Sequence, residues 1–295
     1  MALTSPGVIK AANEILVGLA PEVNVIKQFQ FDISDAVADY GAKVRVAMID
    51  GGTAENYGAD NCADTNTGNY GHATGSLSDF FVTLDAQPKS TIKITSTDKL
   101  ELPNDSFWAR SAEAGKNSIA KAISTKIGGL FTTENCAAGK VTMASVTKSA
   151  LAKLRSNAAS KGRIADYVLI LDSDYYADAL ALFDSYVYGG TEPVQDGLIP
   201  KFYGFKALVA GYDLPAGVKG VLVPSNGLAI AVRPVAIPDP AAYPECSVET
   251  DPNTGFSVTA MRHTDFNTGA SLFNVTTLIG ADLARKNDTF YIAAS

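Results

Sequence analysis

The feature that most constrains this chain is one long helical pattern that begins after Pro103 and ends near Phe131. Asn104 and Asp105 supply side-chain oxygens that can cap its first turn. At 1.5 Å per residue, about 26 residues reach roughly 40 Å, so the fold must provide a core of that length. Apolar or small residues recur at steps of three or four, which is typical of a helix buried along one side: Trp108, Ala112, Gly115, Ile119, Ile123, Ile127 and Leu130.

The segment before this helix has the opposite character. Residues 50–78 are rich in Gly, Asn, Asp and Thr and contain almost no aliphatic side chains. Lys43–Ile49 alternates like a strand, and the chain returns through two more strand patterns, Phe80–Leu84 and Ser90–Thr95. We therefore predict a flexible hairpin excursion that leads into the long helix. A protruding hairpin of this kind favours contact with another copy of the chain.

Composition excludes several classes of protein. The chain has 295 residues, 46% of them hydrophobic and 19% charged, which predicts a globular protein with an ample core. A net charge of −7 disfavours direct duplex binding. The three cysteines are far apart and form no CxxC pair, which indicates a reducing, intracellular origin. The sequence shows no signal peptide and no apolar run near 18 residues, so we expect a soluble, unsecreted protein with no membrane partner.

At the N-terminus, the spacing predicts a helix over Pro6–Leu19 and an extended segment over Val23–Phe31, and residues 1–31 do not form a compact unit by pattern alone. After the long helix, the patterns predict an α/β unit over residues 137–235. Its expected elements are a helix at Met143–Ala159, a strand at Ala165–Leu171, a helix at Ser173–Phe183, and strands at Phe205–Ala210, Lys219–Val223 and Leu228–Val232.

A proline cluster between Pro234 and Pro244 indicates a linker after this unit. Strand patterns then resume at Phe256–His263, Ala270–Ile279 and Thr289–Ile292. Because their natural partners are strands early in the chain, we expect the α/β unit to be an insertion in one discontinuous domain.

The residues that carry chemistry are sparse, and we predict no catalytic, cofactor or metal site. Neither His72 nor His263 pairs with a Ser or Cys in a nucleophile motif, and no phosphate-binding glycine motif is present. Asp172-Ser173-Asp174 follows a buried strand, where paired carboxylates hold a divalent metal in nucleotide-sugar transferases. The alternative, which we favour, is that Asp172 or Ser173 caps the helix that follows.

The order of these elements is specific. Short motifs accompany it at Val82–Asp85 with Ser90–Thr95, at Asp166–Tyr176, and at Gly197–Phe205 with Leu208–Pro215. In order and motifs the chain resembles the major capsid proteins of tailed bacteriophages, the Hong Kong 97-type fold, over nearly its whole length. In that family the hairpin is the E-loop and the long helix is the spine helix.

The resemblance implies an α+β fold with four parts. These are an N-terminal arm and entry strand at residues 1–42, the E-loop at 43–95, a peripheral domain with the spine helix at 96–136 and 236–295, and an inserted axial domain at 137–235.

The implied function is that of a major capsid protein, not an enzyme. Copies would form the hexamers and pentamers of an icosahedral shell around double-stranded DNA, which is enclosed without sequence-specific binding. The resemblance implies a separate scaffolding protein and a portal as partners, synthesis in the host bacterial cytoplasm, and a final location in the virion. One alternative is an encapsulin-type nanocompartment shell, for which Pro6–Leu19 would be the cargo-receiving helix. The alternative from another class is a metal-dependent glycosyltransferase that uses Asp172 and Asp174.

Overall fold

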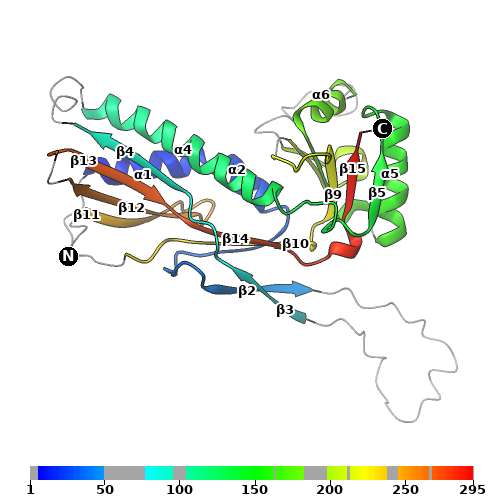
Figure 1. Cartoon of the computed structure of the whole chain (residues 1–295), viewed down its shortest axis with the longest axis horizontal. Coiled ribbons are helices and arrows are strands. Elements are labelled where there is room, and N and C mark those ends of the chain that lie inside the picture. The colour runs from blue at the N-terminus through cyan, green and yellow to red at the C-terminus, as the bar shows by residue number, and fades with distance from the viewer. Residues whose placement is uncertain are drawn as a thin grey trace, which may run out of the picture.

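The computed structural model describes residues 6–49, 77–95, 104–162, 164–182, 198–210, 213–237, 245–265 and 268–294. The chain forms an elongated body, an α/β unit at one end of it, and a two-stranded ribbon that leaves the body beside that unit (Figure 1). Mixed sheets and few helices make this an α+β fold, as predicted.

The body is built on α4 (Asn104–Gly128) and α1 (Pro6–Gly18), which pack together over one four-stranded antiparallel sheet (Figure 1). The strand order in that sheet is β11 (Glu245–Thr250), β12 (Ser257–Thr264), β13 (Ser271–Thr276) and β4 (Lys89–Ile94). A Cβ on Gly115 would lie 2.9 Å from Cδ1 of Ile15, so the glycine permits the close approach of the two helices.

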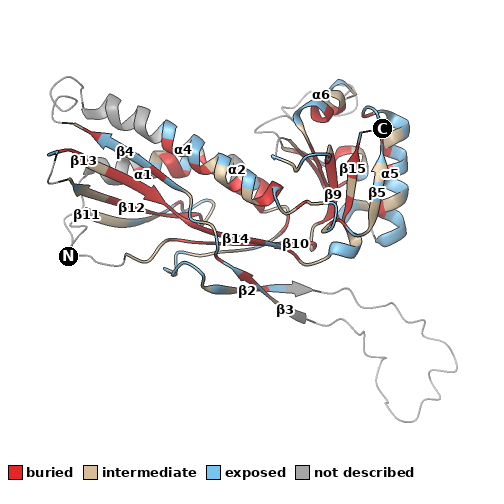
Figure 2. Ribbon diagram, in the orientation of Figure 1, coloured by how far each residue is buried: buried red, intermediate tan, exposed pale blue. Residues whose placement is uncertain are grey.

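The predicted long helix is confirmed, and so is its buried side. Ile119, Ile123 and Ile127 are fully buried in the main core, visible as red turns of α4 in Figure 2. The predicted stripe also included Trp108 and Ala112, whose side chains lie outside the described part. The helix pattern at the N-terminus is confirmed as well, since Ile15 and Leu16 of α1 are buried in the same core.

A three-stranded sheet continues the body toward the α/β unit. Its order is β1 (Gln30–Ile33), β10 (Leu228–Arg233) and β14 (Leu278–Leu283). The guanidinium of Arg233, largely buried, donates 2.7 Å to Oδ2 of Asp32 and 2.9 Å to the Asp32 carbonyl. This paired contact ties the entering strand β1 to the centre of the sheet.

The α/β unit contains a six-stranded sheet whose two faces pack into two different hydrophobic clusters. α5 (Lys148–Lys161) and α6 (Ser173–Ala181) pack in one hydrophobic cluster with Leu169 and Leu171 of β6, whereas Val168 and Ile170 of the same strand point into the main core. The strand order is β5 (Gly139–Thr142), β15 (Phe290–Ala293), β9 (Gly220–Pro224), β6 (Tyr167–Leu171), β8 (Ala207–Ala210) and β7 (Leu198–Pro200).

Strand pairing crosses the expected boundaries of the inserted unit. β10 falls within residues 137–235 but pairs with β1 and β14 in the body. β15 falls within residues 236–295 but pairs with β5 and β9 in the six-stranded sheet. One strand from each of these two ranges therefore pairs in the sheet of the other part of the fold.

The extended segment expected at Val23–Phe31 is wrong in its first half, where the structure has a helix, α2 (Ala20–Ile26). Pro21 lies in the first turn of α2, where its missing N–H costs nothing. Val23 and Ile26 are buried in the main core, so this part of the N-terminal segment packs against the body.

Two other predicted elements have different bounds. The single strand expected at Ala270–Ile279 is two strands, because Thr277 is buried between them and its hydroxyl lies 3.2 Å from the carbonyls of Arg233 and Ser257. The helix expected from Met143 begins at Lys148. Met143 still pairs with the end of β15, and the Thr147 side chain caps the helix by accepting from the Ala150 N–H at 3.2 Å.

Candidate functional site

The first candidate site is the ribbon formed by β2 (Lys43–Ile49) and β3 (Leu77–Thr83). The two strands pair antiparallel from Lys43 opposite Thr83 to Ile49 opposite Leu77. Within the described residues they form a two-stranded sheet of their own, which lies below the body in Figure 1. The residues between them, which include His72, Cys62 and most of the glycine-rich segment, lie outside the described part.

The base of the ribbon is docked on the body. Val46 and Val82 are buried in a small cluster with Ala229, Ala231 and Leu278 of the three-stranded sheet. A Cβ on Gly280 would overlap the carbonyl of Thr83 and lie 2.7 Å from Cγ1 of Val82, so only glycine lets β3 approach this closely.

Polar contacts also hold the base of the ribbon in place, and one of them joins it to α4. The Lys126 ammonium at the end of α4 lies 2.7 Å from the Asp85 carboxylate. The Tyr40 hydroxyl donates to the Asp85 carbonyl at 2.8 Å, and the Leu84 N–H donates to the Ala42 carbonyl at 2.9 Å. These contacts were not predicted from the sequence, because the two residues in each contact are about forty positions apart.

The outer side of the ribbon exposes apolar side chains. Phe81 is 57% exposed, and Val37 and Tyr40 at the base are also exposed, although each is large enough to contribute to a core. Alternation along β3 thus buries Val82 and presents Phe81. An exposed aromatic on a protruding ribbon is the kind of residue that anchors protein contacts.

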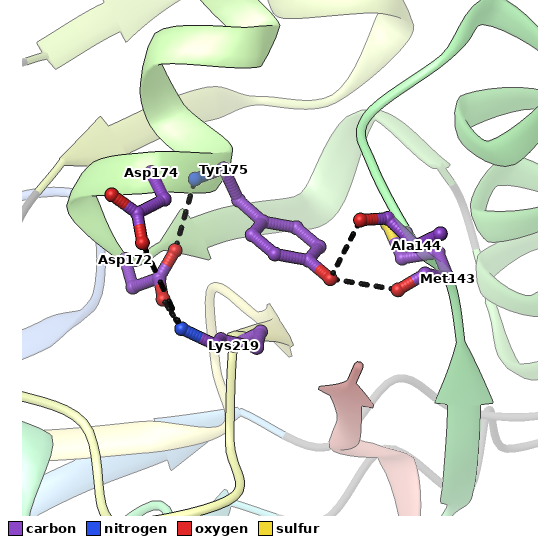
Figure 3. Close-up of polar contacts among 6 residues, drawn as sticks. All are labelled: Met143, Ala144, Asp172, Asp174, Tyr175 and Lys219. Carbon is purple, nitrogen blue, oxygen red and sulfur yellow. Dashed lines mark hydrogen bonds and ion pairs between the residues drawn. The ribbon is translucent and has the colours of Figure 1, made fainter. Parts of the chain in front are cut away.

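The second candidate site lies at the carboxyl end of β6 (Figure 3). We call it the Asp172 cluster, and its side chains are those of Asp172, Asp174, Tyr175 and Lys219. The Asp172 carboxylate accepts from the Tyr175 N–H at 3.0 Å, which caps α6, and from the Lys219 ammonium at 2.8 Å. Asp174 lies 3.9 Å from the same ammonium. The Tyr175 hydroxyl donates 2.7 Å to the Met143 carbonyl, so the cluster joins β5, α6 and β9.

The electrostatics of this cluster follow from those contacts. The hydrogen bond to Asp172, then the charge of that carboxylate, raises the pKa of Lys219. Burial, then the charge of Asp172, raises the pKa of Tyr175. Both groups therefore keep their protons at neutral pH, Lys219 as a cation and Tyr175 as a hydrogen-bond donor.

The favoured interpretation of Asp172 as a helix cap is confirmed. Lys219 occupies the position beside the carboxylates that a divalent metal would need, and it was missed because it lies 47 residues away in the sequence. Among the described residues, no group of three or more His, Cys, Asp or Glu side chains is arranged to hold a metal. Asp172 and Asp174 thus have a structural explanation, and the glycosyltransferase alternative has no support here.

The remaining predicted residues do not gather into a site. His263 lies on β12, in the body, far along the chain from the Asp172 cluster. Cys136 is buried, which raises the pKa of its thiol to about 12, while Cys246 is half-buried on β11. None of the helices in the described ranges is both long and apolar enough to cross a bilayer.

Comparison with known proteins decides what this arrangement resembles. No protein-family model matches the chain, and no curated protein matches it. Solved structures do match. A virus-like particle from Pyrococcus furiosus is 14% identical with a TM-score of 0.55, and the match covers 96% of this chain and 97% of that one.

This chain has the fold of phage capsids and capsid-like particles. The capsid of Ralstonia phage GP4 is 11% identical with a TM-score of 0.51, covering 90% of this chain and 86% of that chain. The capsid of a native GTA particle is 14% identical with a TM-score of 0.51, covering 92% and 90%. The Hong Kong 97-type resemblance found in the sequence is thereby confirmed at the level of the fold.

Proposed function

We propose that this chain is the major capsid protein of a tailed bacteriophage, which self-assembles into the hexamers and pentamers of an icosahedral shell around double-stranded DNA. The observation that carries the proposal is the capsid-type fold over almost the whole chain, combined with a ribbon that projects apolar surface away from its own core. Within the described residues, the base of the ribbon packs against its own chain, whereas Phe81 is exposed. A task between copies explains that exposure.

The parts of the capsid fold map onto the chain as follows. α4 is the spine helix, and β2 and β3 are the strands of the E-loop at residues 43–95. Residues 1–42 are the N-terminal arm and entry strand. The peripheral domain takes residues 96–136 and 236–295, and the axial domain takes 137–235, with β10 and β15 exchanged between them as the sheets require.

In this scheme the E-loop lies across a neighbouring copy and places Phe81 against it. The buried half of the ribbon, Val46 and Val82, sets its direction relative to α4. The partners beyond the chain itself are a scaffolding protein, a portal and packaged DNA that is not bound sequence-specifically. The chain is made in the host bacterial cytoplasm and ends in the virion.

The test is to express the full chain and examine it by negative-stain microscopy and sedimentation velocity. We expect closed shells or capsomers. A 31 kDa monomer at every concentration would refute the proposal. Replacing Phe81 with Ser, with the exposed Lys121→Ser on α4 as the matched control, tests whether the ribbon is the contact: the first variant loses assembly and the second keeps it.

A second candidate is a nanocompartment shell that encloses protein cargo. It is favoured by one observation, the packing of α1 and α4 into one core, since a helical N-terminus is what the cargo-receiving shells have. The contents of purified shells separate the two. Phage capsids are expected with nucleic acid, a scaffolding protein or neither, whereas a cargo enzyme retained by α1 would favour the compartment.

A further inference from the structure

The two helices α5 and α6 of the α/β unit carry charges of opposite sign. Residues 135–165 contain no Asp or Glu, and their basic residues are Lys140, Lys148, Lys153, Arg155, Lys161 and Arg163. Residues 166–200 contain no Lys or Arg, and their acidic residues are Asp166, Asp172, Asp174, Asp178, Asp184, Glu192 and Asp196. α5 lies in the first stretch and α6 in the second. A separation this complete is unexpected in a chain whose total charge is −7.

The basic side chains of α5 are exposed and available. Lys148, Lys153 and Lys161 are exposed, and in the described part of the chain no ion pair includes any of them. The buried side of the helix is formed by Leu151 and Leu154 with Ala158. Between the lysines, the outward side carries the small residues Ser149, Ala152, Ser156, Ala159 and Ser160, which let another surface approach closely.

A hollow of about 230 Å³ lies at the N-terminal end of α5. Its wall includes the hydroxyl-bearing Ser145, Thr147 and Ser149, together with Lys153. Hydroxyl donors, an ammonium and the positive end of a helix all favour an anionic group. A carboxylate side chain from outside the chain fits this chemistry.

α6 presents the complementary charge on the same face of the sheet. Asp174 has a side chain that is 84% exposed, and its ion-pair partner among the described residues is Lys219, at 3.9 Å. Both helices pack on one hydrophobic cluster, so the face of the α/β unit that is turned away from the main core carries the exposed lysines of α5 and the exposed carboxylate of Asp174 on α6. Such a face is complementary to a copy of itself.

We propose that α5 of one copy docks against α6 of a second copy of this chain, in a contact repeated head to tail around a capsomer. The inference rests on the proposed shell function and names the surface that its axial domains use. A heterologous contact of this kind closes into a ring when the rotation permits. Opposite charges on the two helices favour the correct register. The like charges on two copies of α5 disfavour a contact between them. Nucleic acid could also bind the lysines of α5, but nucleic-acid binding would not account for the exposed carboxylate on α6.

The first test reverses the charge of α5 in the full chain, with Lys148→Glu, Lys153→Glu and Lys161→Glu. The matched control makes the same change in charge at exposed lysines outside α5 and outside residues 43–95, with Lys121→Glu, Lys201→Glu and Lys286→Glu. We expect the assembled fraction of the α5-reversed chain to fall about tenfold, with an unchanged thermal midpoint. The control keeps more of its assembly than the α5-reversed chain.

The second test restores the contact. An α6-reversed chain carries Asp174→Asn, Ala177→Lys and Ala181→Lys at outward positions of α6. We expect it to assemble poorly alone, and the chain with both helices reversed to recover assembly. High salt weakens the wild-type contact, because the Debye length shrinks to about 3 Å at 1 M.

The outcomes separate the two proposals. If the wild type forms no oligomer of any size, the shell function and this contact are both overturned. If shells form and the α5-reversed chain assembles as well as the wild type, only the contact is overturned. The contact also fails if reversal leaves the shells intact but removes copurifying nucleic acid, measured by ultraviolet absorbance, because α5 would then serve packaged DNA.

Discussion

The body around α4 and the β2–β3 ribbon use apolar residues in opposite ways. In the body, Ile119, Ile123 and Ile127 of α4 are fully buried in one core that also contains residues of α1, the four-stranded sheet and the α/β unit. In the ribbon, only the inward residues Val46 and Val82 are covered, and Phe81 is presented outward. The body therefore buries its apolar residues within one copy of the chain, whereas the ribbon leaves a large apolar side chain exposed to solvent.

The largest expected effect comes from the body. Ile123→Ala removes a fully buried side chain from the middle of α4 and leaves a cavity, which costs about 2–5 kcal/mol of unfolding free energy. Denaturant unfolding measures it. Lys121→Ala, on the exposed side of the same helix, should change the free energy by less than about 0.5 kcal/mol. Equal effects would mean that α4 is not held by its apolar side.

The ribbon base is expected to be next. Gly280→Ala places a methyl group against the Thr83 carbonyl and Val82, which forces β3 away from β14 at a cost of about 1–3 kcal/mol. Gly162→Ala is the control, because the nearest atom to its new Cβ is 3.8 Å away, in Tyr167, and its backbone is extended. Thermal unfolding compares the two, and equal midpoints would contradict the docked geometry.

Adjacent residues of β3 give the sharpest contrast. Val82→Ala should cost about 1–2 kcal/mol, because Val82 is buried against the body. Phe81→Ala should leave the unfolding free energy within about 0.5 kcal/mol and reduce assembly instead. Unfolding and sedimentation of both variants check this. A destabilised Phe81→Ala monomer would place the ribbon's outer side in the core of one copy.

The smallest effect belongs to the ion pair between Lys126 and Asp85. Asp85→Asn should cost about 0.2–1 kcal/mol, since the Asp85 side chain is 48% exposed and water screens the pair. The loss should shrink further in high salt. Unfolding at two salt concentrations measures it, with Asp39→Asn, an exposed neighbour with no ion pair among the described residues, as the comparison. A cost that is unchanged by salt would point to packing rather than charge.

Local patterns in the sequence predicted local structure well. The long helix and its buried isoleucines follow from spacing alone, since residues three and four apart share one side of a helix. α2 was missed because Pro21 is compatible both with the end of one helix and with the first turn of the next. Asp172 was correctly interpreted as a cap because that bond spans three residues.

What the sequence did not reveal is which distant segments pair. Alternation in β10 and β15 indicates strands, but it does not identify their neighbours, which are β1 and β14 for β10 and β5 and β9 for β15. Lys219 beside Asp172, and Gly280 beneath β3, are likewise contacts between distant residues. The ribbon was predicted as an excursion from the body. Its docking on the body was not predicted, because it depends on contacts between distant residues, such as Gly280 with Thr83 and Lys126 with Asp85.

The position of β15 has a consequence for biosynthesis. Phe290–Ala293 lies between β5 and β9, so among the described strands β5 is joined to the rest of the sheet only through β15, which is synthesised long after β5. A nascent chain on the ribosome can build α4 and its ribbon, but it cannot close the six-stranded sheet that supports α5 and α6. Contacts between α/β units that need the closed sheet are therefore delayed until β15 has been synthesised.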